Sequence, residues 1–129
     1  MSGELIWVVE DNDQNFELVD YLLSENGYRV LRARDGGEVR RLLSGEAPHL
    51  VLLDMNLPSG SGLDIVGELR HSPLVLSAPI VAVTAHAMRG DRERFLAAGC
   101  DEYISKPIET STFLETVRAL LDRAAGNER

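Results

Sequence analysis

A buried strand is predicted by the segment His49-Leu50-Val51-Leu52-Leu53-Asp54-Met55-Asn56, in which four consecutive aliphatic residues stop at a carboxylate. An apolar run without alternation is typical of a strand covered on both faces, as in the middle of a parallel sheet. Asp54 then falls at the carboxyl end of the strand, where open α/β sheets bind ligands. An acidic residue at this place also fits a simple turn or helix cap, so the rest of the chain must decide.

The remaining apolar patterns predict four more strands and five helices. The strands are expected at 5–9, 28–31, 79–83 and 101–105. Apolar residues at three- and four-residue steps predict helices at 13–25, around 39–43, around 63–69, at 91–98 and around 113–124. Strands that alternate with helices predict an α/β fold, a doubly wound parallel sheet with helices on both faces. We expect one domain over 1–129, with its core at about 4–122, a weakly helical and mobile segment at 87–90, and a frayed tail over 123–129.

Composition limits the classes of function. The 13 basic and 21 acidic residues give a net charge of -8, which disfavours direct binding to DNA or to anionic membranes. The single cysteine, Cys100, excludes an internal disulfide and a zinc site made of several cysteines. No apolar run approaches the roughly 20 residues of a membrane span, and the N-terminus lacks a signal-peptide pattern. We therefore expect a soluble, cytoplasmic protein.

Polar side chains follow four of the five predicted strands. In a parallel sheet the carboxyl ends share one edge, which brings together Glu10, Asp11, Asp54, Thr84 and Lys106. Three neighbouring carboxylates repel one another unless a cation is present, and a small oxygen cluster suits Mg²⁺ better than Ca²⁺. A carboxylate beside a metal and a lysine can attack a phosphoryl group, and the Thr84 hydroxyl can donate to a phosphate oxygen.

Four motifs in order carry a resemblance to a known family. They are Val8-Val9-Glu10-Asp11-Asn12, Leu53-Asp54-Met55-Asn56-Leu57-Pro58 with Gly62, Val83-Thr84-Ala85, and Tyr103-Ile104-Ser105-Lys106-Pro107-Ile108. Over about 4–122 the chain resembles the receiver domain of bacterial two-component response regulators. The resemblance implies a flavodoxin-like sheet with strand order 2-1-3-4-5.

The resemblance also implies a role for each acidic residue. Asp54 would accept a phosphoryl group from a phosphohistidine on a histidine kinase or a histidine phosphotransfer protein. Asp11 and Asp54 would coordinate Mg²⁺ together with the backbone carbonyl of Asn56, and Glu10 would act through water.

A second group of residues would bind the phosphate and switch the domain. Lys106 would pair with the phosphate, and its bond to Pro107 would be cis. Thr84 and Ala85 would approach the phosphate, while Tyr103 would turn into the cleft. The surface formed by the helix at 91–98, the strand at 101–105 and the last helix would then change its affinity for a downstream protein.

Several properties stay open. Asn56 and His86 are expected to tune dephosphorylation, in a direction that the sequence does not give. A phosphorylation-dependent homodimer is one alternative for the oligomeric state. The segment from Ala85 to Pro107 is similar to receivers that work alone and to receivers attached to hybrid kinases, so the chain is either a single-domain regulator or a receiver excised from a hybrid histidine kinase.

Two other functions compete with this one. A phosphatase with an aspartyl-phosphate intermediate, as in the haloacid dehalogenases, has a second Asp two residues after the nucleophile, where this chain has Asn56. A nucleotide or flavin binder needs a glycine-rich phosphate loop, but Gly60-Ser61-Gly62 leads to Ile65 where that loop needs glycine. We therefore expect a signalling module that promotes its own phosphorylation and dephosphorylation, and not a turnover enzyme.

Overall fold

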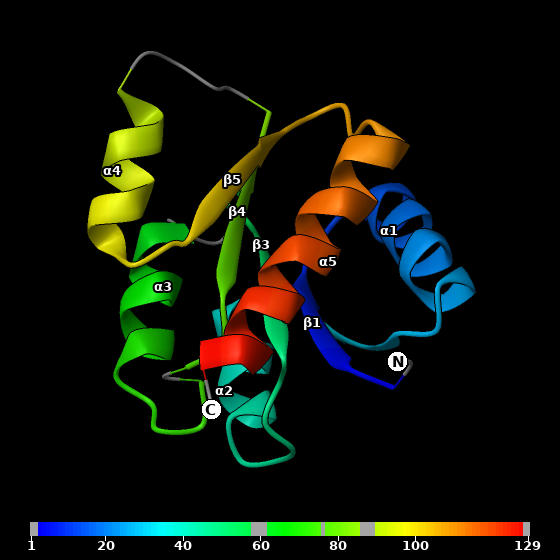
Figure 1. The fold of residues 1–129 in the computed structure, drawn as a ribbon. Coiled ribbons are helices and arrows are strands. Elements are labelled where there is room, and N and C mark those ends of the chain that lie inside the picture. Colours follow the sequence, from blue (N-terminus) through cyan, green and yellow to red (C-terminus); the bar gives the residue numbers. More distant parts are fainter. Residues whose placement is uncertain (1–2, 58–61, 76, 86–89, 128–129) are drawn as a thin grey trace.

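A computed structural model describes residues 3–57, 62–75, 77–85 and 90–127, which form a five-stranded parallel sheet flanked by five helices (Figure 1). The strands are β1 (Leu5–Val9), β2 (Arg29–Ala33), β3 (Leu50–Asp54), β4 (Ile80–Thr84) and β5 (Glu102–Ser105). The helices are α1 (Asp13–Glu25), α2 (Gly36–Leu42), α3 (Gly62–Arg70), α4 (Asp91–Ala98) and α5 (Thr110–Asn127). The strand order β2-β1-β3-β4-β5 confirms the predicted flavodoxin-like fold.

Helices cover both faces of the sheet, and each face has its own core. Trp7 of β1 belongs to the core beneath α2, α3 and α4, and it is fully buried there. Phe113 of α5 belongs to the core that α1 and α5 close on the opposite face. Every residue of β1, β3 and β4 is buried, which explains why these strands are continuous apolar runs.

The register of the strands aligns their carboxyl ends. Val9 of β1 pairs with Leu53 of β3, and Asp54 pairs with Val83 of β4. Thr84 in turn pairs with Ser105 of β5. The residues at and directly after these positions therefore meet along one edge of the sheet, as the sequence predicts.

α1 starts at this edge with a side-chain cap and ends, at the opposite edge, before a glycine in the left-handed conformation. The Asn12 side chain accepts a hydrogen bond of 2.9 Å from the Asn15 N–H, so α1 begins directly after the acidic pair Glu10-Asp11. Gly27 follows α1 with a φ of +86°, a left-handed conformation that favours glycine and confirms the predicted stop.

The predicted ranges differ from the structure most at β2 and α5, while β4 and β5 differ by one residue at the ends concerned. β2 starts one residue later than predicted and continues to Ala33, because the edge strand alternates between exposed and partly buried residues instead of forming an apolar run. α5 remains helical to Asn127, although fraying is predicted from 123; Ala124 and Ala125 are good helix formers and extend it. The predicted loop residues 58–61 and the segment 86–89 lie outside the described residues.

Arg70, at the end of α3, binds two connections at the opposite edge of the sheet, the one that precedes β4 and the one that precedes β5. Its Nη2 atom lies 2.6 Å from Asp101 Oδ2, and its Nε donates to the Gly99 carbonyl at 2.9 Å. Its Nη1 donates to the Ala78 carbonyl at 2.9 Å, just before β4. Asp101 Oδ2 also accepts from the Ile80 N–H at 2.8 Å. Arg70 therefore ties the C-terminal end of α4 to the start of β4.

Gly62 and Gly67 of α3 provide a matched test of how closely this helix packs against Met55, the residue that follows β3. A Cβ at Gly62 would lie 2.8 Å from Met55 Cα, so Gly62→Ala should lower the free energy of unfolding by about 1–3 kcal/mol. A Cβ at Gly67 meets nothing within 4 Å, so Gly67→Ala should raise it by about 0.5–1 kcal/mol through helix propensity. Urea denaturation followed by the fluorescence of the single tryptophan, Trp7, measures both. Equal effects of the two variants would contradict the close contact at Met55.

Candidate functional site

Three carboxylates meet at the carboxyl edge of the sheet. Glu10 and Asp11 follow β1, Asp54 ends β3, and an oxygen of each lies within 4.8 Å of the others. Glu10 and Asp54 are 5% and 4% exposed, because the strands that carry them lie in the middle of the sheet. The predicted acidic cluster is therefore assembled, and two of its members are shielded from water.

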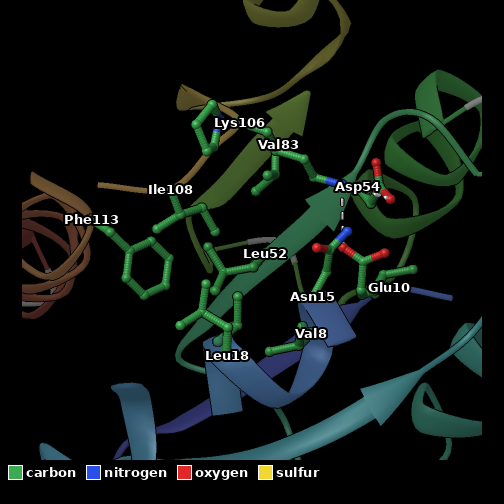
Figure 2. Close-up of a pocket in the computed structure, with 13 residues that line it drawn as sticks. Val8, Glu10, Asn15, Leu18, Leu52, Asp54, Val83, Lys106, Ile108 and Phe113 are labelled. Carbon is green, nitrogen blue, oxygen red and sulfur yellow. Dashed lines mark hydrogen bonds and ion pairs between the residues drawn. The ribbon is translucent and has the colours of Figure 1, made fainter. Parts of the chain in front are cut away.

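Lys106 supplies the positive charge next to this cluster. Its Nζ atom lies 3.3 Å from Asp54 Oδ2 and 3.4 Å from Glu10 Oε1, as Figure 2 shows. The Lys106 backbone N–H donates to the Thr84 carbonyl at 2.8 Å, which fixes the end of β5 beside β4. The peptide bond between Lys106 and Pro107 is cis, the isomer that the resemblance implies.

The electrostatic balance of the site favours an added cation. Burial raises the pKa of Glu10 above its usual range, and the nearby Asp54 carboxylate acts in the same direction. The Asn12 N–H, 3.1 Å from Glu10 Oε2, and the Lys106 charge oppose this shift. One lysine cannot neutralise three carboxylates, and the carboxylate oxygens are donors that Mg²⁺ prefers. The residues present therefore fit a divalent cation.

Asn56 connects the loop after β3 to the loop after β4. Its backbone N–H donates to Asp54 Oδ1 at 2.8 Å and orients that carboxylate. Its side-chain Oδ1 accepts from Thr84 Oγ1 at 3.2 Å and from the Ala85 N–H at 3.0 Å. Three residues that the sequence assigns to the site, Asn56, Thr84 and Ala85, are thus in direct contact.

Tyr103, a further predicted site residue, does not contact the acidic cluster in this structure. Tyr103 is half-buried in β5, and its ring packs edge-on against Phe95 of α4 with 6.3 Å between the ring centres. It therefore belongs to the core beneath α4 in this structure. His86 lies outside the described residues.

A cavity of about 140 Å³ opens beside Asp54 between α1 and α5. Apolar side chains form its wall, and Figure 2 labels Val8, Leu18, Leu52, Val83, Ile108 and Phe113 among them. Glu10, Asn15, Asp54 and Lys106 form its polar end. The carboxylate of Asp54 therefore borders an open space that a small chemical group can enter.

Arg32 contacts the acidic turn, Glu10-Asp11-Asn12, and is not among the site residues that the sequence predicts. Arg32 of β2 donates from Nε to the Glu10 carbonyl at 3.0 Å, and its Nη2 lies 2.9 Å from Asp13 Oδ1. The predicted strand ends at Leu31, one residue before Arg32, whereas β2 continues to Ala33. The available signal was period-two alternation, which places Arg32 on the same face of the strand as Val30.

The fold and this site together define a class of protein, a flavodoxin-like domain with an acidic cluster at the carboxyl ends of its strands. The family model of the response regulator receiver domain matches residues 6–118. The polar-differentiation response regulator DivK of Brucella anthropi is 40% identical over 119 residues, which cover 92% of this chain and 97% of DivK.

Solved structures agree with this match. A CheY-like response regulator receiver domain protein from Methanospirillum hungatei superposes with a TM-score of 0.89 at 27% identity, over 98% of this chain and 99% of that one. The receiver domain of the sensor histidine kinase PA1611 from Pseudomonas aeruginosa, solved with a magnesium ion coordinated in its active-site cleft, gives 0.84 at 31% identity, over 94% of this chain and 99% of that one. The chain belongs to the response regulator receiver domain family, the signalling modules that act with histidine kinases in two-component systems.

Within residues 3–57, 62–75, 77–85 and 90–127, no helix has both the length and the apolar character needed to cross a membrane.

The raised pKa of Glu10 predicts a pH-dependent effect of substitution. A group with a raised folded-state pKa stabilises the fold below its unfolded value of 4.5, and this contribution is lost as pH rises through the folded value. Without divalent cations, Glu10→Gln should therefore raise the thermal midpoint at pH 7.5. The difference should vanish below about pH 4, where the wild-type carboxyl is protonated in both states.

Glu109 offers a control of the opposite sign. Hydrogen bonds from Thr112 and Ser111 lower the pKa of this exposed carboxyl, so its contribution is present at neutral pH and is lost as pH falls. Glu109→Gln should lower the midpoint at pH 7.5 and leave it unchanged in acid. A midpoint for Glu10→Gln below that of wild type at pH 7.5 would show that its pairing with Lys106 outweighs the burial of its charge.

Proposed function

We propose that the chain is a phosphorylation-driven switch in which Asp54 accepts a phosphoryl group from a phosphohistidine of a histidine kinase or histidine phosphotransfer protein. The observation that carries the proposal is the position of the Asp54 carboxylate, which is buried at the end of β3, 3.3 Å from Lys106 Nζ and beside an open cavity. A nucleophile for phosphoryl transfer needs this combination of a fixed orientation and neighbouring charges that offset those of the phosphate.

In the transfer, an Asp54 oxygen attacks phosphorus and forms a P–O bond while the P–N bond to the donor imidazole breaks. The bonding electron pair leaves with the imidazole nitrogen, which then takes a proton. A Mg²⁺ ion held by Asp11, Asp54 and the Asn56 carbonyl, with Glu10 acting through water, would neutralise charge on the phosphoryl oxygens. The Asn56 N–H holds Asp54 in place, and Lys106 exchanges its carboxylate contacts for a phosphate oxygen. Water later attacks phosphorus, the P–O bond to Asp54 breaks, and inorganic phosphate leaves, which restores the Asp54 carboxylate.

The conformational response requires several contacts that change together. Moving an equilibrium from 1:99 to 99:1 takes about 5.5 kcal/mol, whereas a hydrogen bond to a charged group contributes about 1.5–3 kcal/mol. Thr84 also has to give up its bond to Asn56 before it can reach the phosphate, which reduces its net contribution. We therefore assign the switch to Thr84, Ala85 and Lys106 acting jointly, with Tyr103 moving toward the cleft.

The output surface that we propose consists of α4, β5 and α5, which lie next to one another at the edge of the sheet that ends in β5 (Figure 1). Its chemistry is mixed, since the exposed Leu96 lies on the same helix as Arg92 and Arg94. A protein partner fits this surface better than DNA, because the chain carries a net charge of -8. A phosphorylation-dependent homodimer through this surface and a cytoplasmic location belong to the same proposal.

Phosphorylation gives the primary test. Incubation with Mg²⁺ and acetyl phosphate should add one phosphoryl group per chain, measured by intact mass spectrometry at neutral pH. Asp54→Asn should abolish the addition because the amide is a poor nucleophile. Asp64→Asn is the matched control, since Asp64 is an exposed carboxylate on α3, and it should leave the addition unchanged. Modification that persists in Asp54→Asn would refute the assignment.

A second experiment separates phosphorylation from switching. Mg²⁺ and beryllium fluoride, which mimic the phosphorylated state, should shift the Tyr103 ring resonances in NMR spectra of the wild type. Thr84→Ser keeps the hydroxyl that donates to the phosphate and should retain most of the shift, whereas Thr84→Ala should lose most of it. A full shift in Thr84→Ala would exclude the hydroxyl from the switch.

The competing phosphatase function makes a different prediction about turnover. Its mechanism needs a general acid two residues after the nucleophile, but the amide there accepts hydrogen bonds from Thr84 and Ala85. We expect stoichiometric phosphorylation without sustained hydrolysis of p-nitrophenyl phosphate. Continuous release of nitrophenol that Asp54→Asn abolishes would support the phosphatase instead.

A further inference from the structure

Arg32 contacts the connection between β1 and α1 at Glu10, and the first turn of α1 at Asp13 and Phe16. Its Nε donates to the carbonyl of Glu10 at 3.0 Å, and its Nη2 lies 2.9 Å from the carboxylate of Asp13. Its guanidinium carbon lies 4.4 Å above the centre of the Phe16 ring. The Arg32 side chain is only 17% exposed, so the guanidinium is held in a fixed, largely desolvated place.

These contacts flank Asp11, one of the proposed cation ligands. Asp11 lies between Glu10 and Asp13, the two residues that Arg32 binds. The Glu10 carbonyl belongs to the peptide unit that joins Glu10 to Asp11, so a hydrogen bond to this carbonyl fixes the plane from which Asp11 projects. On the other side of Glu10, its N–H donates to the Ala33 carbonyl at 2.9 Å. β2 therefore holds the acidic turn through backbone and side-chain contacts.

Arg34 shares the charge of Arg32 but not this geometry. Its Nη1 lies 3.0 Å from the same Asp13 oxygen, and half of its side chain is exposed. Its backbone N–H donates to Glu38 Oε1, which ties it to α2 rather than to the acidic turn. The two arginines differ in the contact with the Glu10 carbonyl and in the stacking on Phe16.

The action of Arg32 is geometric more than electrostatic. Lys106 and the Asn12 N–H contact the carboxylate of Glu10, whereas Arg32 binds the backbone carbonyl of this residue. Arginine also suits the role because its planar group presents several donors in fixed directions, whereas a lysine ammonium is a flexible point charge.

We propose that Arg32 is a positioning residue for the divalent-cation site, and that it sets cation affinity by fixing the Glu10-Asp11 peptide. This inference rests on the proposed function, because it assumes that Asp11 coordinates Mg²⁺. Mg²⁺ requires nearly ideal octahedral geometry at about 2.0–2.1 Å, so a small displacement of one ligand costs affinity. Replacing a residue that holds a metal ligand in place by hydrogen bonds typically lowers metal affinity about 10–100-fold.

The test compares Mg²⁺ affinities of wild type, Arg32→Gln and the matched charge control Arg34→Gln. Affinity follows from the rise of the thermal midpoint with MgCl₂ at constant ionic strength, with Trp7 fluorescence as the unfolding signal. Arg32→Gln should weaken Mg²⁺ binding about tenfold or more. Arg34→Gln should leave it unchanged or slightly tighter, because it removes a positive charge without touching the peptide.

A kinetic measurement separates positioning from general damage to the fold. In phosphorylation by acetyl phosphate, Arg32→Gln should raise the Mg²⁺ concentration for half-maximal rate while the rate at saturating Mg²⁺ stays close to wild type. If Arg32→Gln does not fold, Arg32→Lys replaces it in both measurements. Lys keeps the charge and part of the apolar stem but lacks the planar fork, so weaker Mg²⁺ binding is again the expected result.

Three results would overturn the inference. The first is an Arg32 variant that folds and binds Mg²⁺ as tightly as wild type. The second is an equal change in Arg32→Gln and Arg34→Gln, which would assign the effect to net charge. The third is a wild type whose midpoint does not respond to Mg²⁺; this would also refute the cation site of the proposed function, whereas the first two leave that site intact.

Discussion

Two buried carboxylates, Glu10 and Asp54, share a single lysine, and much of the active edge of the sheet depends on this arrangement. Lys106 reaches both acids because β5 ends beside β4 and its backbone N–H binds the Thr84 carbonyl. The charge balance remains negative, so the fold keeps an electrostatic cost that a cation can remove. The hydrophobic cores on both faces of the sheet stabilise the fold, so that it tolerates this cost.

The burial of the central strands explains why the fold and most of the site can be predicted from the sequence. Strands covered on both faces must be apolar throughout, so β1, β3 and β4 are visible as continuous runs. The crossover connections between parallel strands then place the carboxyl ends of the strands at one edge of the sheet. Once the runs are recognised, the residues at their carboxyl ends must meet, and Glu10, Asp54 and Thr84 do so.

Contacts made by side chains across elements are much harder to predict. β2 is an edge strand with alternating exposure, so its end at Ala33 is not marked by an apolar run. Arg32 therefore appears as an ordinary surface residue until the turn that it binds is placed in space. The bonds from Thr84 and Ala85 to Asn56 depend on two loops that are distant in sequence, and periodicity carries no information about them.

The two ends of α4 are held differently. At the C-terminal end, Gly99 is bound through its carbonyl to Arg70, and a Cβ there would lie 3.0 Å from the Arg70 side chain. At the N-terminal end, Gly90 has a φ of +90° and provides no side-chain cap. The last turn of α4 is therefore tied to α3 by Arg70, whereas no side-chain cap holds its first turn. In the switch that we propose, we expect α4 to be displaced more at its first turn than near Gly99.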